Sequence, residues 1–118
     1  MSKKILVIDD DVDILEALKI SLESEGYETK VTPDGTTAIE QVRAYRPDLI
    51  LLDIMLSGCD GRDIASCLKK ELDLKNIPIV MISAKQMAEQ SALDCGASAF
   101  LPKPFAMDTL YSTVKAYV

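Results

Sequence analysis

Short hydrophobic runs alternate with longer amphipathic segments along the chain. Residues 4–8, 49–52 and 79–82 each contain four consecutive apolar side chains. Runs of this length without polar alternation are typical of strands that are buried on both faces of a sheet. The sequence therefore predicts three central strands at these positions.

Between these runs, hydrophobic residues recur every three or four positions, which is the period of an amphipathic helix. Gly26 and Pro47 follow the first two stripes, and Asp60-Gly61 precedes the third, which places helix-ending and helix-capping residues where the periodicity predicts boundaries. The four predicted stripes are Ile14, Leu15, Leu18 and Leu22; Ala38, Val42 and Tyr45; Ile64, Cys67, Leu68 and Leu72; and Met107, Leu110, Val114 and Tyr117.

Two further strands complete the predicted sheet. Residues 27–32 alternate in polarity, which indicates a half-exposed strand at a sheet edge, and residues 99–101 form a short fifth strand. Strands that alternate with helices predict an α/β fold with a parallel sheet, helices on both faces and right-handed crossovers. We expect residues 1–118 to form a single domain, because 118 residues fit one compact core.

Polar residues follow the predicted strands at one edge of the sheet. Asp9 and Asp10 follow the first strand, Asp53 the third, Ser83 the fourth and Lys103 the fifth. The carboxyl ends of parallel strands meet at one edge, so we expect these five side chains to form one pocket. Clustered carboxylates repel one another unless a cation compensates, and oxygen ligands favour Mg²⁺.

This pocket has the groups that phosphoryl transfer to a carboxylate requires. A carboxylate such as Asp53 can act as the nucleophile, while Lys103 and Ser83 can bind the phosphoryl oxygens. Most of these residues alone have an ordinary explanation: Asp9 and Asp10 could cap a helix, as we expect of Asp11 or Asp13, while Ser83 could bond to the nearby backbone and Lys103 could be a solvated charge. Asp53 is less ordinary, because it interrupts an apolar run and a buried charge needs a partner. The functional interpretation depends on all five pocket residues occurring together.

The composition narrows the possible chemistry. The chain has no histidine, which excludes Ser-His-Asp and Cys-His catalysis, histidine metal ligands and the role of phosphohistidine donor. The net charge of −6 argues against direct nucleic acid binding, and no apolar run reaches the roughly 20 residues that span a membrane, so we expect a cytoplasmic protein. Of the three cysteines, we expect Cys67 and Cys95 to pack between helices and Cys59, in a loop, to be more reactive.

The chain resembles the receiver domain of bacterial response regulators over its whole length and is similar to the chemotaxis regulator. The resemblance implies a flavodoxin-like, doubly wound sheet with strand order 2-1-3-4-5 and five helices. It also implies a phosphoacceptor signalling module that assists only its own phosphorylation and slow dephosphorylation, rather than an enzyme. The matching segments are residues 5–10, 51–55, 60–61, 82–84, 96–97 and 100–105.

The same resemblance implies a role for each acidic residue. Asp53 is the phosphoacceptor, and Asp10 and Asp53 ligate Mg²⁺ together with the backbone carbonyl of Met55. Asp9 contributes to the metal site mainly through water. The phosphoryl donor would be a sensor histidine kinase or a histidine phosphotransfer protein.

The resemblance further implies a switch. Lys103 and Ser83 hold the phosphoryl oxygens. In the family, the peptide bond between this lysine and the following proline, here Lys103-Pro104, is usually cis. Ser83 and Phe100 then transmit the change to the surface of the fourth helix, fifth strand and fifth helix. This surface would bind a downstream protein target, an effector domain or, in a phosphorylation-dependent dimer, a second copy.

Two positions and one segment depart from the family pattern. Ser57 stands where the family commonly has proline, and Cys59 replaces a larger apolar residue, so we expect a more mobile loop after Asp53. The segment from Lys85 to Cys95 is shorter than usual, which affects the length and placement of the fourth helix.

Two alternative functions are compatible with parts of the sequence. Asp9-Asp10-Asp11-Val12 also resembles the motif of haloacid-dehalogenase-type phosphatases, with Asp9 as nucleophile and Asp11 as acid/base. Only Asp108 follows Lys103 as a further acidic residue, and the chain is too short for a cap domain, which argues against that reading. A receiver-like module that works without phosphorylation is the second alternative, against which the complete pocket argues.

Overall fold

A central five-stranded parallel sheet organises the structure, a computed structural model that describes residues 2–85 and 88–118. The strand order is β2-β1-β3-β6-β7, which is 2-1-3-4-5 when the strands of this sheet are numbered alone. The predicted doubly wound order is therefore confirmed, and β2 lies at an edge as predicted. The strands are β1 (Lys4–Ile8), β2 (Glu28–Thr32), β3 (Leu49–Asp53), β6 (Ile79–Ser83) and β7 (Ala99–Pro102).

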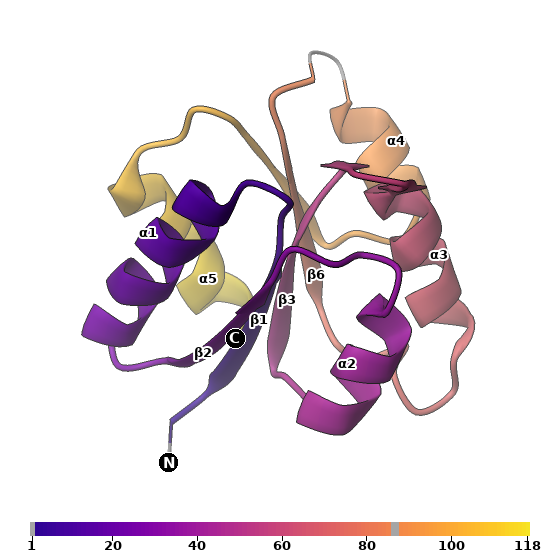
Figure 1. The fold of residues 1–118 in the computed structure, drawn as a ribbon, viewed down its shortest axis with the longest axis horizontal. Helices are drawn as coiled ribbons and strands as arrows, with labels where there is room; N and C mark the ends of the chain where they lie inside the picture. The colour runs from indigo at the N-terminus through magenta and orange to yellow at the C-terminus, as the bar shows by residue number, and fades with distance from the viewer. Residues whose placement is uncertain (1, 86–87) are drawn as a thin grey trace.

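Five helices cover the two faces of this sheet (Figure 1). The helices α1 and α5 lie on one face, and α2, α3 and α4 lie on the other. This arrangement confirms the flavodoxin-like layers that the sequence predicts. The helices are α1 (Val12–Ser24), α2 (Ala38–Tyr45), α3 (Gly61–Lys70), α4 (Glu89–Asp94) and α5 (Met107–Tyr117).

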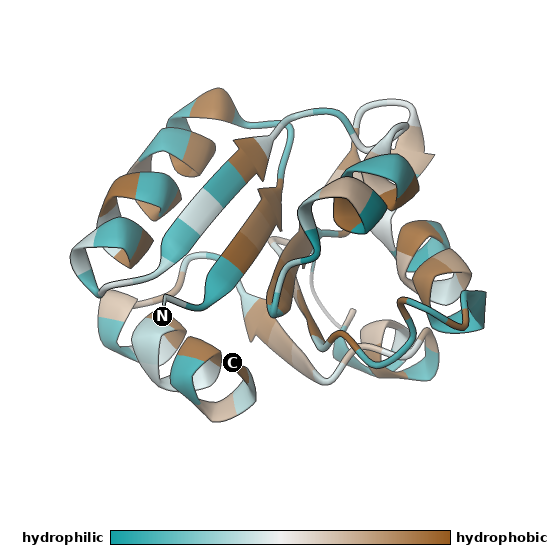
Figure 2. Ribbon diagram, turned by 90° about the horizontal axis from the view of Figure 1, so that it is seen from below, coloured by the Kyte–Doolittle hydropathy of each residue, from teal (hydrophilic) through white to brown (hydrophobic). Residues whose placement is uncertain are grey.

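The continuous hydrophobic runs fill two cores at once. Successive strand residues point to opposite faces, so Ile5 and Val7 pack toward α1 and α5, while Leu6 and Ile8 pack toward α2, α3 and α4. All four side chains are fully buried. Figure 2 shows hydrophobic residues concentrated on the central strands, whereas each helix also carries hydrophilic residues.

Capping residues fix the helices that border the carboxyl edge of the sheet. The Asp11 carboxylate accepts hydrogen bonds from the backbone of Asp13 and Ile14 at the start of α1, and the Asp60 carboxylate accepts one from the backbone of Arg62 at the start of α3. Gly26 follows α1 with a φ of 93°, a conformation that glycine adopts without strain. Of the two predicted capping candidates, Asp11 rather than Asp13 caps α1, and the predicted boundaries at Asp60 and Gly26 are confirmed.

Some residues of the third and fourth predicted hydrophobic stripes are not buried in the structure, so the prediction is wrong for them. The helix α3 ends at Lys70, so Leu72 lies beyond it and is 83% exposed. Ile64, Ala65 and Leu68 form the buried side of α3, which leaves Cys67 exposed on the flank rather than packed between helices. On α5, the ends of the stripe, Met107 and Tyr117, are also exposed.

The segment after Asp53 is a hairpin rather than the predicted loop. The short strands β4 (Met55–Leu56) and β5 (Cys59–Asp60) pair antiparallel, and Ser57 and Gly58 form the turn. Gly58 has a φ of 78°, which lets the chain reverse within two residues.

The helix α4 spans only six residues, in agreement with the short Lys85 to Cys95 segment, of which residues 86–87 lie outside the described residues. Cys95, directly after α4, is half-buried and packs against the core beneath α2, α3 and α4, as predicted. In the described part of the chain, no helix combines the length and hydrophobicity that crossing a membrane requires.

Candidate functional site

The candidate site lies where the order of the strands reverses. The chain runs from β1 outward to β2 and then returns to place β3 on the other side of β1. In doubly wound sheets, this reversal leaves a crevice at the carboxyl ends of the two neighbouring strands. Asp9 directly follows β1 and Asp53 ends β3, and the pairing of Ile8 with Leu52 brings both carboxylates to the same level of the sheet.

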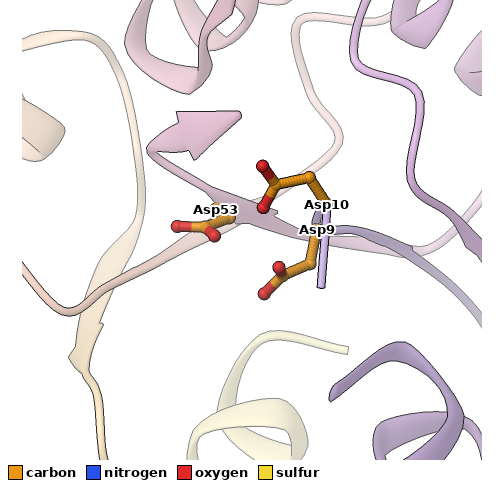
Figure 3. Close-up of side chains that lie close together, drawn as sticks. All are labelled: Asp9, Asp10 and Asp53. Carbon is orange, nitrogen blue, oxygen red and sulfur yellow. The ribbon is translucent and has the colours of Figure 1, made fainter. Parts of the chain in front are cut away.

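Three carboxylates meet in this crevice, as the sequence predicts (Figure 3). Asp9, Asp10 and Asp53 each offer an oxygen, and these oxygens all lie within 4.8 Å of one another. Asp9 is fully buried and Asp53 is 5% exposed, whereas Asp10 is open to solvent. Buried carboxylates at this distance require positive charge nearby.

Lys103 provides part of that charge. Its ammonium lies 2.8 Å from Asp9 Oδ2 and 3.2 Å from Asp53 Oδ2, so one cation is shared between the two buried carboxylates. The backbone N–H of Lys103 donates to the Ser83 carbonyl at 2.9 Å, which anchors the residue at the edge of the sheet. The predicted cis peptide between Lys103 and Pro104 is present.

The pKa shifts show that Lys103 does not fully compensate the carboxylates. Burial, followed by the neighbouring charge of Asp9, raises the pKa of Asp53 although Lys103 opposes the shift. Burial alone would lower the pKa of Lys103, but its hydrogen bond and charge interaction with Asp9, together with those of Asp53, raise it. The lysine therefore stays protonated, and three carboxylates beside one ammonium give the cluster a formal excess of negative charge.

We expect Asp53→Asn to stabilise the fold at neutral pH without divalent ions. The raised pKa of Asp53 means that folding favours its protonated form, so the ionised carboxylate lowers stability once the pH exceeds that raised value. The neutral variant should unfold about 3–5 °C higher in the presence of EDTA. Thermal unfolding at a series of pH values falling from neutrality measures this, because the advantage of the neutral variant must shrink as Asp53 of the wild type becomes protonated. A difference that is negative at neutral pH, or that does not shrink as the pH falls, would contradict the assignment.

Ser83 and Phe100 lie where the sequence predicts them. Ser83 ends β6 and is almost fully buried, and its hydroxyl oxygen accepts a hydrogen bond from the Lys85 backbone at 2.9 Å. The register pairs Asp53 with Ile82, the residue before Ser83, so the two site residues come from adjacent strands. Phe100, on β7, is half-buried against the core beneath α2, α3 and α4.

The Met55 backbone also contacts the acceptor candidate. Its N–H approaches Asp53 Oδ1 at 3.3 Å, while the residue is 60% exposed.

Two residues near the site were not predicted to contact it. Ser57, at the tip of the β4–β5 hairpin, donates a hydrogen bond from its hydroxyl to Asp10 Oδ2 at 3.0 Å. Gly61 packs so closely that a Cβ atom there would overlap the Asp53 backbone carbonyl oxygen. The Asp60-Gly61 pair marks this glycine in the sequence, but as a helix start the pair does not predict its close approach to Asp53.

Cys59 does not have the reactivity that its predicted loop position indicates. Burial, followed by the negative charges of Asp34, Asp60 and Asp63, raises the pKa of its thiol. The thiolate is the reactive form, so this environment makes Cys59 less reactive than a free cysteine.

An α/β sheet with an acidic crevice at its switch point, completed by a lysine and a hydroxyl, defines a class of phosphoacceptor signalling domains. The family model described as "Response regulator receiver domain" matches residues 5–115. The chain therefore belongs to the response regulator receiver domain family, the phosphoacceptor modules of two-component systems.

Individual relatives agree with this assignment. The chain is 42% identical over 118 residues to the DNA-binding response regulator MtrA of Mycolicibacterium paratuberculosis, covering 98% of this chain and 51% of that protein. A putative response regulator from Chloroflexus aurantiacus superposes with a TM-score of 0.94 at 28% identity, covering 99% of this chain and 98% of the other. The chemotaxis protein CheY4 of Vibrio cholerae superposes with a TM-score of 0.92 at 26% identity, with 100% of both chains covered. The chain spans about half the length of the curated relatives that it matches.

Proposed function

We propose that residues 1–118 act as one receiver unit in which Asp53 accepts a phosphoryl group from a phosphohistidine of a sensor kinase or phosphotransfer protein. A carboxylate oxygen of Asp53 forms the new bond to phosphorus while the bond from phosphorus to the donor nitrogen breaks. The observation that carries this proposal is the Lys103 ammonium, which lies 3.2 Å from Asp53 Oδ2 and can move its hydrogen bond to a phosphoryl oxygen. Ser83, on the adjacent strand, supplies a second donor.

Mg²⁺ fits the carboxylate cluster because every side-chain ligand there is a hard oxygen and the pocket keeps excess negative charge. Asp10, Asp53 and the backbone carbonyl of Met55 would hold the ion, with Asp9 acting through water. When bound, Mg²⁺ supplies charge neutralisation for the phosphoryl oxygens. Lys103 already occupies Asp9 Oδ2, which supports the indirect role of Asp9.

We further propose that Ser83 and Phe100 carry the output. Movement of the Ser83 hydroxyl toward a phosphoryl oxygen would break its hydrogen bond from the Lys85 backbone and free the space that it occupies. Phe100, half-buried on the neighbouring strand, can then enter the core more deeply. This would change the surface of α4, β7 and α5, which we propose binds an effector or a second copy.

A hydrophobic hollow beside the site supports docking of the phosphoryl donor. It has a volume of about 330 Å³, and Lys103 belongs both to its lining and to the carboxylate crevice. An apolar surface at the mouth of an acidic pocket can hold a partner protein while its histidine faces Asp53. The hollow is lined by Ile14, Ala84, Lys103, Pro104 and Phe105.

The phosphatase alternative is weaker than the receiver function in this geometry. Asp9 is fully buried, and its Oδ2 lies closer to the Lys103 ammonium, at 2.8 Å, than Asp53 Oδ2 does, at 3.2 Å. The Asp11 carboxylate caps α1 instead of facing the pocket. Neither residue is placed for the nucleophile and acid/base roles of that enzyme class.

Phosphorylation by acetyl phosphate should require a divalent ion and Asp10. We expect one phosphoryl group per chain with Mg²⁺, none with EDTA, and an affinity for Mg²⁺ that is at least about tenfold weaker in Asp10→Ala. Intact-protein mass spectrometry measures the labelling, and a Mg²⁺ titration measures the affinity. Asp11→Ala is the matched control, since it removes a neighbouring carboxylate that caps α1 without joining the cluster. Equal labelling with and without divalent ions would refute the proposed site.

A further inference from the structure

Asp10 differs from the other two carboxylates of the cluster in its partners. Lys103 pairs with Asp9 and Asp53. Within residues 2–85 and 88–118, Asp10 forms no such ion pair, and its side chain is open to solvent. The hydrogen bond from the Ser57 hydroxyl to Asp10 Oδ2, at 3.0 Å, is the contact that fixes this carboxylate.

The hairpin that carries Ser57 brings it to Asp10 across 47 sequence positions. Pairing of Leu56 with Cys59 places Ser57 at the tip, and the left-handed conformation of Gly58 turns the chain there. At the base of the hairpin, the backbone N–H of Gly61 donates to the Ile54 carbonyl at 2.7 Å. Ser57 is exposed, so its side chain has no packing role that would explain its position.

We propose that Ser57 is a positioning residue that holds the Asp10 carboxylate ready to capture a divalent cation. This inference rests on the proposed function, in which Asp10 is a metal ligand. A carboxylate has about four acceptor sites, so one hydrogen bond from Ser57 leaves the others for the ion. A side chain that is already fixed loses less conformational entropy when the cation binds, so binding is more favourable. Proline, the residue that the family resemblance predicts at this position, has no side-chain donor and cannot make this contact.

The test is Mg²⁺ binding by the full chain without any phosphoryl donor. Amide chemical shifts followed by NMR during a Mg²⁺ titration give the dissociation constant and show that each variant is folded. We expect Ser57→Ala to weaken Mg²⁺ binding about three- to tenfold, the size of effect that one hydrogen bond to a metal ligand produces. Ser57→Thr retains the hydroxyl and should bind Mg²⁺ within about twofold of the wild type.

A double-mutant cycle separates positioning of Asp10 from a general effect on the fold. If Ser57 acts through Asp10, adding Ser57→Ala to an Asp10→Ala chain should leave the remaining Mg²⁺ affinity unchanged. The inference is overturned if Ser57→Ala binds Mg²⁺ as tightly as the wild type or more tightly, or if it causes the same loss in the Asp10→Ala background. If Asp10→Ala itself has no effect, the metal site of the proposed function fails as well. If Asp10→Ala loses Mg²⁺ affinity as expected but Ser57→Ala does not, only the positioning role of Ser57 is refuted.

Discussion

Asp53→Asn should abolish phosphorylation by acetyl phosphate in the presence of saturating Mg²⁺. Asparagine has nearly the same shape, but its neutral amide oxygen is not a competent nucleophile toward phosphorus. The raised pKa of Asp53, caused first by burial and then by the charge of Asp9, indicates that this substitution removes an unfavourable buried charge, so the variant should remain folded. Loss of labelling would therefore report lost chemistry rather than lost structure. Intact mass measures the label, and cleavage by hydroxylamine identifies an acyl phosphate.

The matched control for this prediction is Asp9→Asn, which neutralises the other buried carboxylate that contacts Lys103. We expect this variant to be labelled on Asp53, with altered rate, because its acceptor is intact. Peptide mapping after borohydride reduction locates the labelled residue. An Asp53→Asn chain that still carried a hydroxylamine-labile phosphoryl group on Asp9 would instead support the phosphatase mechanism.

Gly61→Ala should destabilise the fold more than any other single methyl addition at the site. The added Cβ would overlap the Asp53 carbonyl oxygen and approach the Ile54 Cα at 3.0 Å, and both neighbours are backbone atoms that cannot rotate away. Overpacking against rigid backbone costs about 3 kcal/mol, which corresponds to a fall of about 10 °C in the midpoint of thermal unfolding. The displaced Asp53 should also be phosphorylated more slowly.

Gly26→Ala provides the control for conformational cost alone. Gly26 has a φ of 93°, and a Cβ there would meet no atom within 4 Å, so only backbone strain of about 1 kcal/mol is expected. Calorimetry or circular dichroism on both variants compares the two effects. If Gly61→Ala lowers the midpoint of thermal unfolding less than Gly26→Ala does, the close approach of Gly61 to the Asp53 backbone does not constrain the fold.

The sheet and most of the pocket could be predicted because their signals are local. Runs such as residues 49–52 identify buried strands, and parallel strands necessarily bring the residues after them to one edge. The shared location of Asp9, Asp10 and Asp53 at this edge can therefore be predicted from the pattern alone, and the structure brings the three together. The family resemblance added the assignment of roles, which composition and periodicity could not supply.

The unpredicted features depend on contacts between distant residues or on where a helix stops. The hydrogen bond between Ser57 and Asp10 joins positions that no periodicity relates, and two-residue strands such as β4 carry no detectable alternation. Leu72 fits the helical period of the third stripe but lies past the end of α3. The exposure of Cys67 follows from the narrow buried side of that helix, which a period alone does not define.

The contact between Lys103 and Asp9 spans 94 sequence positions, and this separation determines when during synthesis the acceptor site can exist. Contacts of such long range carry a large loop-closure entropy and cannot form before both partners have been synthesised. A nascent chain still on the ribosome, with β7 not yet released, would have its carboxylates without their ammonium. Partly synthesised copies therefore lack the ammonium that pairs with Asp9 and Asp53 in the folded chain.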